Sequence, residues 1–147
     1  MPSIVPSYVY SLFAALIVGT IIVFCCNSLT LNIKNQAESQ QLTNIEKYIA
    51  TQSLKLISQA SATNNNSTQF LEIPASIGTQ QYWIRIASDS QRAWVESGFG
   101  TIITPGHQGI FLPATVSASG NYVSTSGRAY LNCYIENQTM ILKLIEG

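Results

Sequence analysis

The stretch VYSLFAALIVGTIIVFCC, residues 9 to 26, carries no charged side chain and contains no strong helix breaker except Gly19. At about 1.5 Å of helical rise per residue it spans about 27 Å, close to the thickness of a bilayer's hydrocarbon core. A membrane-spanning helix is therefore the first interpretation. A helix that is apolar on every face can equally be buried by copies of itself, because it needs only non-aqueous surroundings. Lipid and protein are thus two alternatives for what covers this helix.

The rest of the chain has room for one small globular domain, since the whole sequence has 147 residues. Charged residues make up 10% of it, with seven basic and seven acidic side chains, so no net field would attract nucleic acid. We therefore expect no nucleic-acid partner. The three cysteines are too few and too unevenly placed for a disulfide framework.

The apolar stretch differs from a cleaved secretory signal, because no Lys or Arg precedes it and no small-x-small cleavage site follows it. We expect the helix to stay in the mature chain. Lys34, Lys47 and Lys55 follow the stretch, and the positive-inside rule would leave the C-terminal part in the cytoplasm. The low charge and the surface rich in Ser, Thr and Asn favour the opposite side. We expect an extracytoplasmic head.

Apolar residues recur at helical spacing beyond the stretch, at Leu42, Ile45, Ile49 and Leu56. Gln52 stands where a coiled-coil seam would need an apolar residue, so we expect this face to pack on the head or on a neighbouring subunit. Residues 27 to 32, NSLTLN, include several poor helix formers and favour a bend. The sequence predicts one helix from about Ser7 to Ala60. It forms an N-terminal segment over residues 1–61, hydrophobic at 9–26 and amphipathic at 27–61.

A linker rich in Asn, Ser and Thr is expected at residues 62–69, because these side chains favour turns over helix. The head follows at residues 70–147. Its expected strands are short runs of β-branched and aromatic residues, FLEI, QYWIRIA, RAWVESG, TIIT, GIFLP, RAYLNCYI and TMILKLI, with ENQT at 136–139 as a hairpin turn. The fold class is α+β, with a long N-terminal hydrophobic helix followed by a small antiparallel β-sandwich or barrel.

Strand alternation predicts which head residues are buried. In QYWIRIA, Tyr82, Ile84 and Ile86 share one face, and Trp83 lies on the other. Trp83 and Trp94 are expected at outward or edge positions, where they would serve as contact anchors or as aromatic core.

Catalytic and metal-binding constellations are missing from the sequence. His107 is the only histidine, and with Cys133 and Met140 it leaves an electron-transfer copper site one histidine short. A nucleophile pair of Cys133 with His107 is disfavoured, because Cys133 shares a strand face with Leu131 and Ile135, which predicts burial. We expect no enzyme, no catalytic residue, no metal and no cofactor. Three N-x-S/T sequons, at Asn65, Asn66 and Asn137, are candidates for N-glycosylation if the head is extracytoplasmic.

The order of parts, an apolar helix, its polar amphipathic continuation and an all-β head, resembles archaeal type IV pilin-like proteins, which include pilins, archaellins and archaellum stator proteins. The head segment LEIPASIGTQQYWIRI also looks like the opening of such heads, through Pro74, Ile77, Gly78, Tyr82 and Ile84. The chain departs from the pattern in lacking a basic processing site and an early-helix glutamate. The resemblance implies assembly or membrane insertion through one set of helix residues: Val9, Leu12, Phe13, Ala15, Leu16, Val18, Gly19, Ile22 and Val23.

Two functions follow from this resemblance. The first is a subunit of a cell-surface filament, in which the helix leaves the membrane and forms a homo-oligomer through bundling with its copies. The small residues Ala14, Ala15 and Gly19 would permit close approach. The second is a single-pass membrane protein whose head binds the cell-envelope lattice, as a stator component does. Both predict a cell-surface location, either in an extracellular filament or on a membrane anchor with an extracytoplasmic head. Motility and adhesion stay open as roles.

Overall fold

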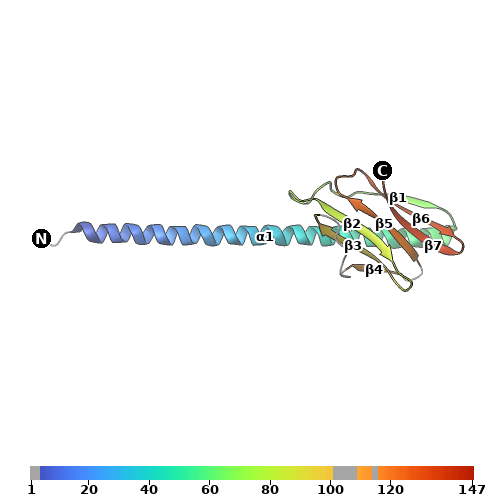
Figure 1. Ribbon diagram of the computed structural model, residues 1–147, viewed down its shortest axis with the longest axis horizontal. Coiled ribbons are helices and arrows are strands. Elements are labelled where there is room, and N and C mark those ends of the chain that lie inside the picture. The colour runs from blue at the N-terminus through green and yellow to red at the C-terminus, as the bar shows by residue number, and fades with distance from the viewer. Residues whose placement is uncertain (1–3, 101–108, 114–115) are drawn as a thin grey trace. The chain divides into compact units, whose positions relative to one another are not determined.

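The computed structural model describes residues 4–100, 109–113 and 116–147 (Figure 1). The chain divides into two compact units, Met1–Ala37 and Glu38–Gly147. His107 and the strand expected at residues 101–104 lie outside the described residues.

Helix α1 runs from Ile4 to Thr63. Pro6 falls in its first turn, where the missing amide hydrogen removes no helical hydrogen bond. The bend expected at residues 27–32 is wrong, because these residues are helical without interruption. Thr30 shows why a poor helix former is tolerated there, since its hydroxyl donates a hydrogen bond to the Cys26 carbonyl oxygen at 2.9 Å.

In the described part of the second unit, seven strands form one sheet, and the α+β class is confirmed. They are β1 (Ser67–Leu71), β2 (Tyr82–Ser88), β3 (Ala93–Phe99), β4 (Ile110–Leu112), β5 (Val116–Val123), β6 (Ala129–Glu136) and β7 (Thr139–Glu146). The strand order is β1-β6-β7-β5-β2-β3-β4, which leaves β1 and β4 at the two edges (Figure 1). The sheet is therefore open, where a sandwich or a closed barrel was expected.

Among the described strands, β5 and β7 form the one parallel pair. Strand β5 has the sequence VSASGNYV, whose Ser, Gly and Asn residues are poor strand formers. The residue pattern therefore did not predict this strand. Its pairing with β2 on one side and β7 on the other joins the two halves of the sheet. The strand is thus stabilised by its neighbours more than by its own residues.

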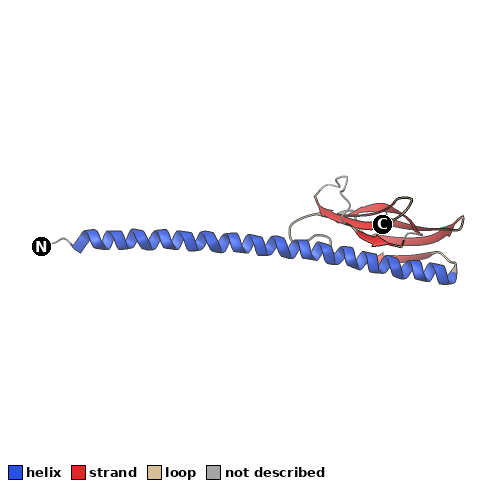
Figure 2. Ribbon diagram, turned by 90° about the horizontal axis from the view of Figure 1, so that it is seen from below, coloured by secondary structure: helices blue, strands red, loops and turns tan. Residues whose placement is uncertain are grey.

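The core of the second unit lies between one face of this sheet and the helix residues from Glu38 onward (Figure 2). Tyr82, Ile84 and Ile86 are buried on this face, as the alternation predicted. The helix contributes a buried stripe consisting of Ile45, Ile49, Leu56 and Ala60. Gln52, which interrupts the apolar pattern, accepts a hydrogen bond from the Gln69 side-chain amide of β1 at 2.6 Å. The amphipathic face therefore packs on the head.

The α1–β1 connection and the β6–β7 turn both contain residues with a left-handed backbone conformation. Asn64 has φ 52° and ends α1, so only residues 64–66 separate the helix from β1. Asn137 and Gln138 have φ 49° and 64°, which is typical of a two-residue type I′ hairpin. The turn predicted at residues 136–139 is confirmed.

Candidate functional site

The apolar part of α1 is the most unusual surface of the described chain. From Tyr8 to Ile33 no side chain is charged, and every residue is exposed. Large apolar side chains in water are unfavourable by about 1.5–3 kcal/mol each, and patches of this extent mark an interaction surface. We call residues Tyr8 to Ile33 the apolar helix segment.

Every residue expected for assembly or membrane insertion lies on the apolar helix segment. Val9, Leu12, Phe13, Leu16, Val18, Ile22 and Val23 have exposed fractions from 45% to 68%, and Ala15 and Gly19 are also exposed. Together with Tyr10, Ile17, Ile21 and Phe24, which are also exposed, these side chains surround the whole circumference of the helix. A single partner helix could cover only part of them.

The hydroxyl groups of Thr20 and Thr30, both in the apolar helix segment, have hydrogen bonds inside the helix. The Thr20 hydroxyl donates to the Ile17 carbonyl oxygen at 2.8 Å. Such bonds matter, because an unsatisfied polar group costs several kcal/mol in a hydrocarbon environment. These hydroxyl groups therefore do not prevent transfer of the segment out of water.

A shallow groove runs along one face of the apolar helix segment. It is lined by Ala15, Leu16, Gly19, Thr20, Val23, Phe24 and Asn27. A side chain added at Gly19 would meet no atom within 4 Å, so the helix itself leaves this space open. Small residues one helical turn apart permit close approach of a second helix.

The helix is long and apolar enough to cross a membrane by length and composition. At about 1.5 Å per residue, the uncharged residues from Tyr8 to Ile33 extend over about 39 Å, more than a hydrocarbon core of about 30 Å. Lipid can therefore cover a stretch of this segment as long as the hydrocarbon core is thick, and neighbouring helices can cover the segment as well.

Two buried glutamates of α1, which the sequence analysis did not identify as contacts, join the helix to the head. The Glu46 carboxylate accepts hydrogen bonds from the Ser97 hydroxyl and from the Ile110 backbone amide, each at 3.2 Å. Glu38 accepts one from the Gln80 side-chain amide at 3.0 Å. Burial of the Glu46 carboxylate raises its pKa above the usual value, although the Ser97 and Ile110 hydrogen bonds oppose the shift. Both glutamates fall on the same helical face as the apolar stripe, which is the signal that could have revealed them.

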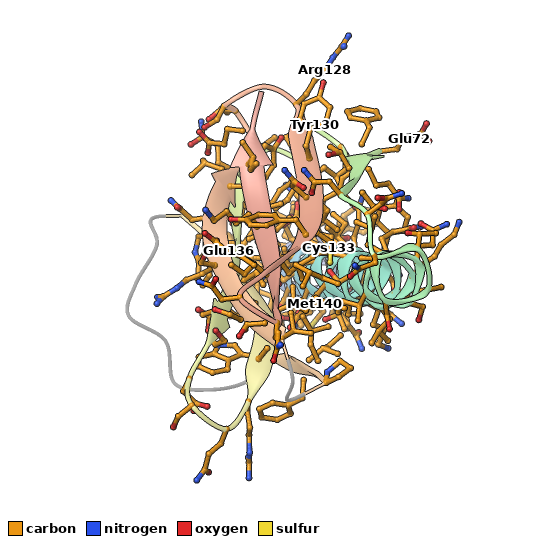
Figure 3. All side chains as sticks on the ribbon, turned by 90° about the vertical axis from the view of Figure 1, so that its right-hand side faces the viewer. Glu72, Arg128, Tyr130, Cys133, Glu136 and Met140 are labelled. Atoms are coloured by element: carbon orange, nitrogen blue, oxygen red, sulfur yellow. The ribbon has the colours of Figure 1, made fainter. Side chains whose placement is uncertain are left out.

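The cysteine of the head is structural. Cys133 is fully buried, and Figure 3 shows it on β6, with Met140 nearby on the adjacent strand. Burial raises the pKa of its thiol and so disfavours the reactive thiolate. The expected burial of Cys133 is confirmed.

Trp83 faces away from the helix, as the alternation predicted, but its side chain is buried. Only 6% of the residue is exposed. Its cross-strand partner is Gly98, and a Cβ added there would lie 2.7 Å from the indole. The missing side chain lets the indole pack flat against β3, where it is covered.

The three sequons occupy exposed positions. Asn65 and Asn66 lie in the connection between α1 and β1, and Asn137 lies in the β6–β7 turn. Among the described residues, no group of three or more His, Cys, Asp or Glu side chains could hold a metal ion.

Comparison with protein families, with curated proteins and with solved structures finds no match to this chain.

Proposed function

We propose that this protein is a structural subunit of an archaeal type IV pilus-like cell-surface filament, which assembles through its N-terminal helix. The observation that supports this most strongly is the apolar helix segment. It is uncharged and exposed over 26 residues, and it belongs to the same helix whose later turns pack on a β-sheet.

The energetics favour a bundle of many copies. Eleven large apolar residues from Val9 to Phe24 are exposed, and covering them all would contribute on the order of 20 kcal/mol. Before assembly, the membrane provides this cover. Withdrawal from lipid is favourable only when neighbouring helices replace almost all of the lipid contacts. In a fibre, several helices around each one would do so, with the β heads on the outside.

The alternative is a permanent single-pass anchor, with the head bound to a component of the cell envelope, as in an archaellum stator. The length of the apolar helix segment favours it, because the segment exceeds the thickness of a hydrocarbon core. In this function Ala15 and Gly19 would serve dimerisation within the membrane. The exposed sequons are compatible with an extracytoplasmic head in both cases.

Electron microscopy of the native cell surface separates the two functions. Filaments whose helical core contains residues 9–26 would support the pilin-like function. Recovery of the protein only from detergent-extracted membranes, with its head bound to an envelope component, would support the anchor.

Replacing Val18 by Asp tests the buried-core requirement directly. An ionised carboxylate at this position would have no partner in a helical bundle, so filaments should be absent. Leu54→Asp is the matched control, because Leu54 is an exposed apolar residue of α1 outside the apolar helix segment. Normal fibres from the Val18→Asp variant would contradict assembly through this helix.

A further inference from the structure

A cavity of about 350 Å³ lies at the sheet edge where β3 meets β4. It is lined by Asp89, Gln91, Arg92, Trp94, Gly109 and Phe111. All of these residues belong to the second unit, so the cavity is separate from the apolar helix segment. Its size lies at the lower end of the range for small-molecule sites, and its lining combines aromatic rings with charged groups of both signs.

The two aromatic side chains come from directly paired positions on adjacent strands. Trp94 and Phe111 are cross-strand partners, so they stand on the same face of the sheet. Phe111 is 54% exposed, and Trp94 is half-buried. The aromatic surface of the cavity is therefore contributed by strands, which hold it more rigidly than a loop would.

A hydrogen bond holds the orientation of the Trp94 indole. Its Nε1 donates to Glu96 Oε2 at 3.3 Å, and Glu96 Oε1 lies 3.4 Å from Arg85 Nε. Glu96 is only 3% exposed, so this carboxylate is a fixed acceptor. The indole is thereby oriented before any ligand arrives, which lowers the entropic cost of binding.

Gly109 allows the chain to pass close to the β3 backbone and to the Trp94 indole. A Cβ at this position would lie 2.5 Å from the Val95 carbonyl oxygen and 3.1 Å from Trp94 Cδ1. Only glycine fits this approach without movement of β3 or of the indole.

Two charged side chains flank the aromatic surface. The Asp89 carboxylate accepts hydrogen bonds from the backbone amides of Gln91 and Arg92 at 2.7 and 2.6 Å, which fixes the turn that carries Arg92. The Arg92 guanidinium carbon lies 5.4 Å from the centroid of the Phe111 ring. Among the described residues of the lining, one acidic and one basic side chain balance each other in charge.

We propose that this cavity binds a saccharide through a single pyranose ring. The C–H groups on one face of a pyranose carry partial positive charge, which suits the negative face of an indole or phenyl ring. Its hydroxyl groups can accept from a guanidinium and donate to carbonyl or carboxylate oxygens. The balanced charge of the described lining gives no preference to a simple ion. This binding activity goes beyond a structural role in a filament.

Saturation-transfer NMR on the full chain tests the proposal. The protein is held in a phosphocholine detergent, which contains no sugar, and is probed with methyl glycosides of glucose, galactose, mannose, N-acetylglucosamine and glucuronic acid. At least one glycoside should give difference signals from its ring protons. Phe111→Ser should weaken its binding about two- to tenfold, because the substitution removes an aromatic contact. Arg92→Gln should weaken the binding as well.

Phe70→Ser is the matched control. Phe70 is also exposed, at 45%, and it also lies under a guanidinium, that of Arg128 at 6.0 Å, but it does not line the cavity. This variant should bind as the unmodified protein does. The proposal is overturned if no glycoside binds at millimolar concentration, or if Phe111→Ser and Phe70→Ser have equal effects. Filament formation is measured separately and should be unchanged in Phe111→Ser, so failure of saccharide binding would not affect the assembly proposal.

Discussion

Replacing Ile49 by Ala should destabilise the second unit by about 2–5 kcal/mol, the range for deleting a large buried side chain. Ile49 is fully buried between α1 and the sheet. Removing three side-chain carbons loses about 2.4 kcal/mol of transfer free energy, at about 0.8 kcal/mol each, and the cavity left behind adds to this. The higher helix propensity of alanine offsets less than about 0.7 kcal/mol. The net effect is therefore a clear loss of stability.

Tryptophan fluorescence during urea unfolding measures this loss. Both tryptophans, Trp83 and Trp94, belong to the sheet, so the signal reports the head while detergent covers the apolar helix segment. With a urea slope of about 1–3 kcal/mol per molar, the midpoint should fall by about 1–2 M.

Leu54→Ala is the control for this substitution. Leu54 lies on the same helix but is 42% exposed, so its replacement should change stability by less than about 1 kcal/mol. Equal midpoint shifts for the two variants would refute the packing of this helical face on the sheet. A shift below about 0.5 M for Ile49→Ala would refute it as well.

Three further substitutions test the head. Gln138→Gly should stabilise it by about 1 kcal/mol, because φ 64° is unfavourable for a residue with a side chain; an unchanged thermal midpoint would contradict this. Glu46→Gln should flatten the pH dependence of stability. The pKa of Glu46 is higher in the folded state than in the unfolded state, so its contribution to folding stability is fully present below about pH 4.5. This contribution is lost as the pH rises through the pKa of the folded state. Parallel profiles of stability against pH for the two proteins would oppose this. Gly98→Val should displace the Trp83 indole and cost about 1–3 kcal/mol, which a red-shifted fluorescence spectrum would report. An unshifted spectrum in the folded Gly98→Val variant would contradict that contact.

Local patterns predicted much of the head, and long-range pairing decided the rest. The alternation of Tyr82, Ile84 and Ile86 predicted their burial, because a strand that packs on one face has a period of two residues. Strand β5 was missed, since its residues have weak strand propensity and its partners β2 and β7 are distant in sequence. The burial of Trp83 was not predicted for a similar reason, because it depends on the space that Gly98 leaves in another strand.

Some features of the candidate functional site could also be predicted from the sequence, and others required the tertiary structure. Charge and hydropathy along the chain were sufficient to locate the apolar helix segment, because a long uncharged helix needs no tertiary contact to be recognised. Charge and hydropathy along the chain could not reveal the aromatic cavity. They could not reveal the glutamates that join α1 to the head either. Each depends on side chains brought together from separate elements, as Glu46 is with Ser97 and Ile110.

By itself, the sequence determined that α1 has an apolar part and an amphipathic part, and that a β-rich head follows, because these properties reside in residue order and spacing. Only the tertiary structure decided that the amphipathic face packs on one open sheet, whose two halves are joined by the parallel β5–β7 pair. Strand order is set by which backbone edges meet in space, and no local pattern of side chains records it.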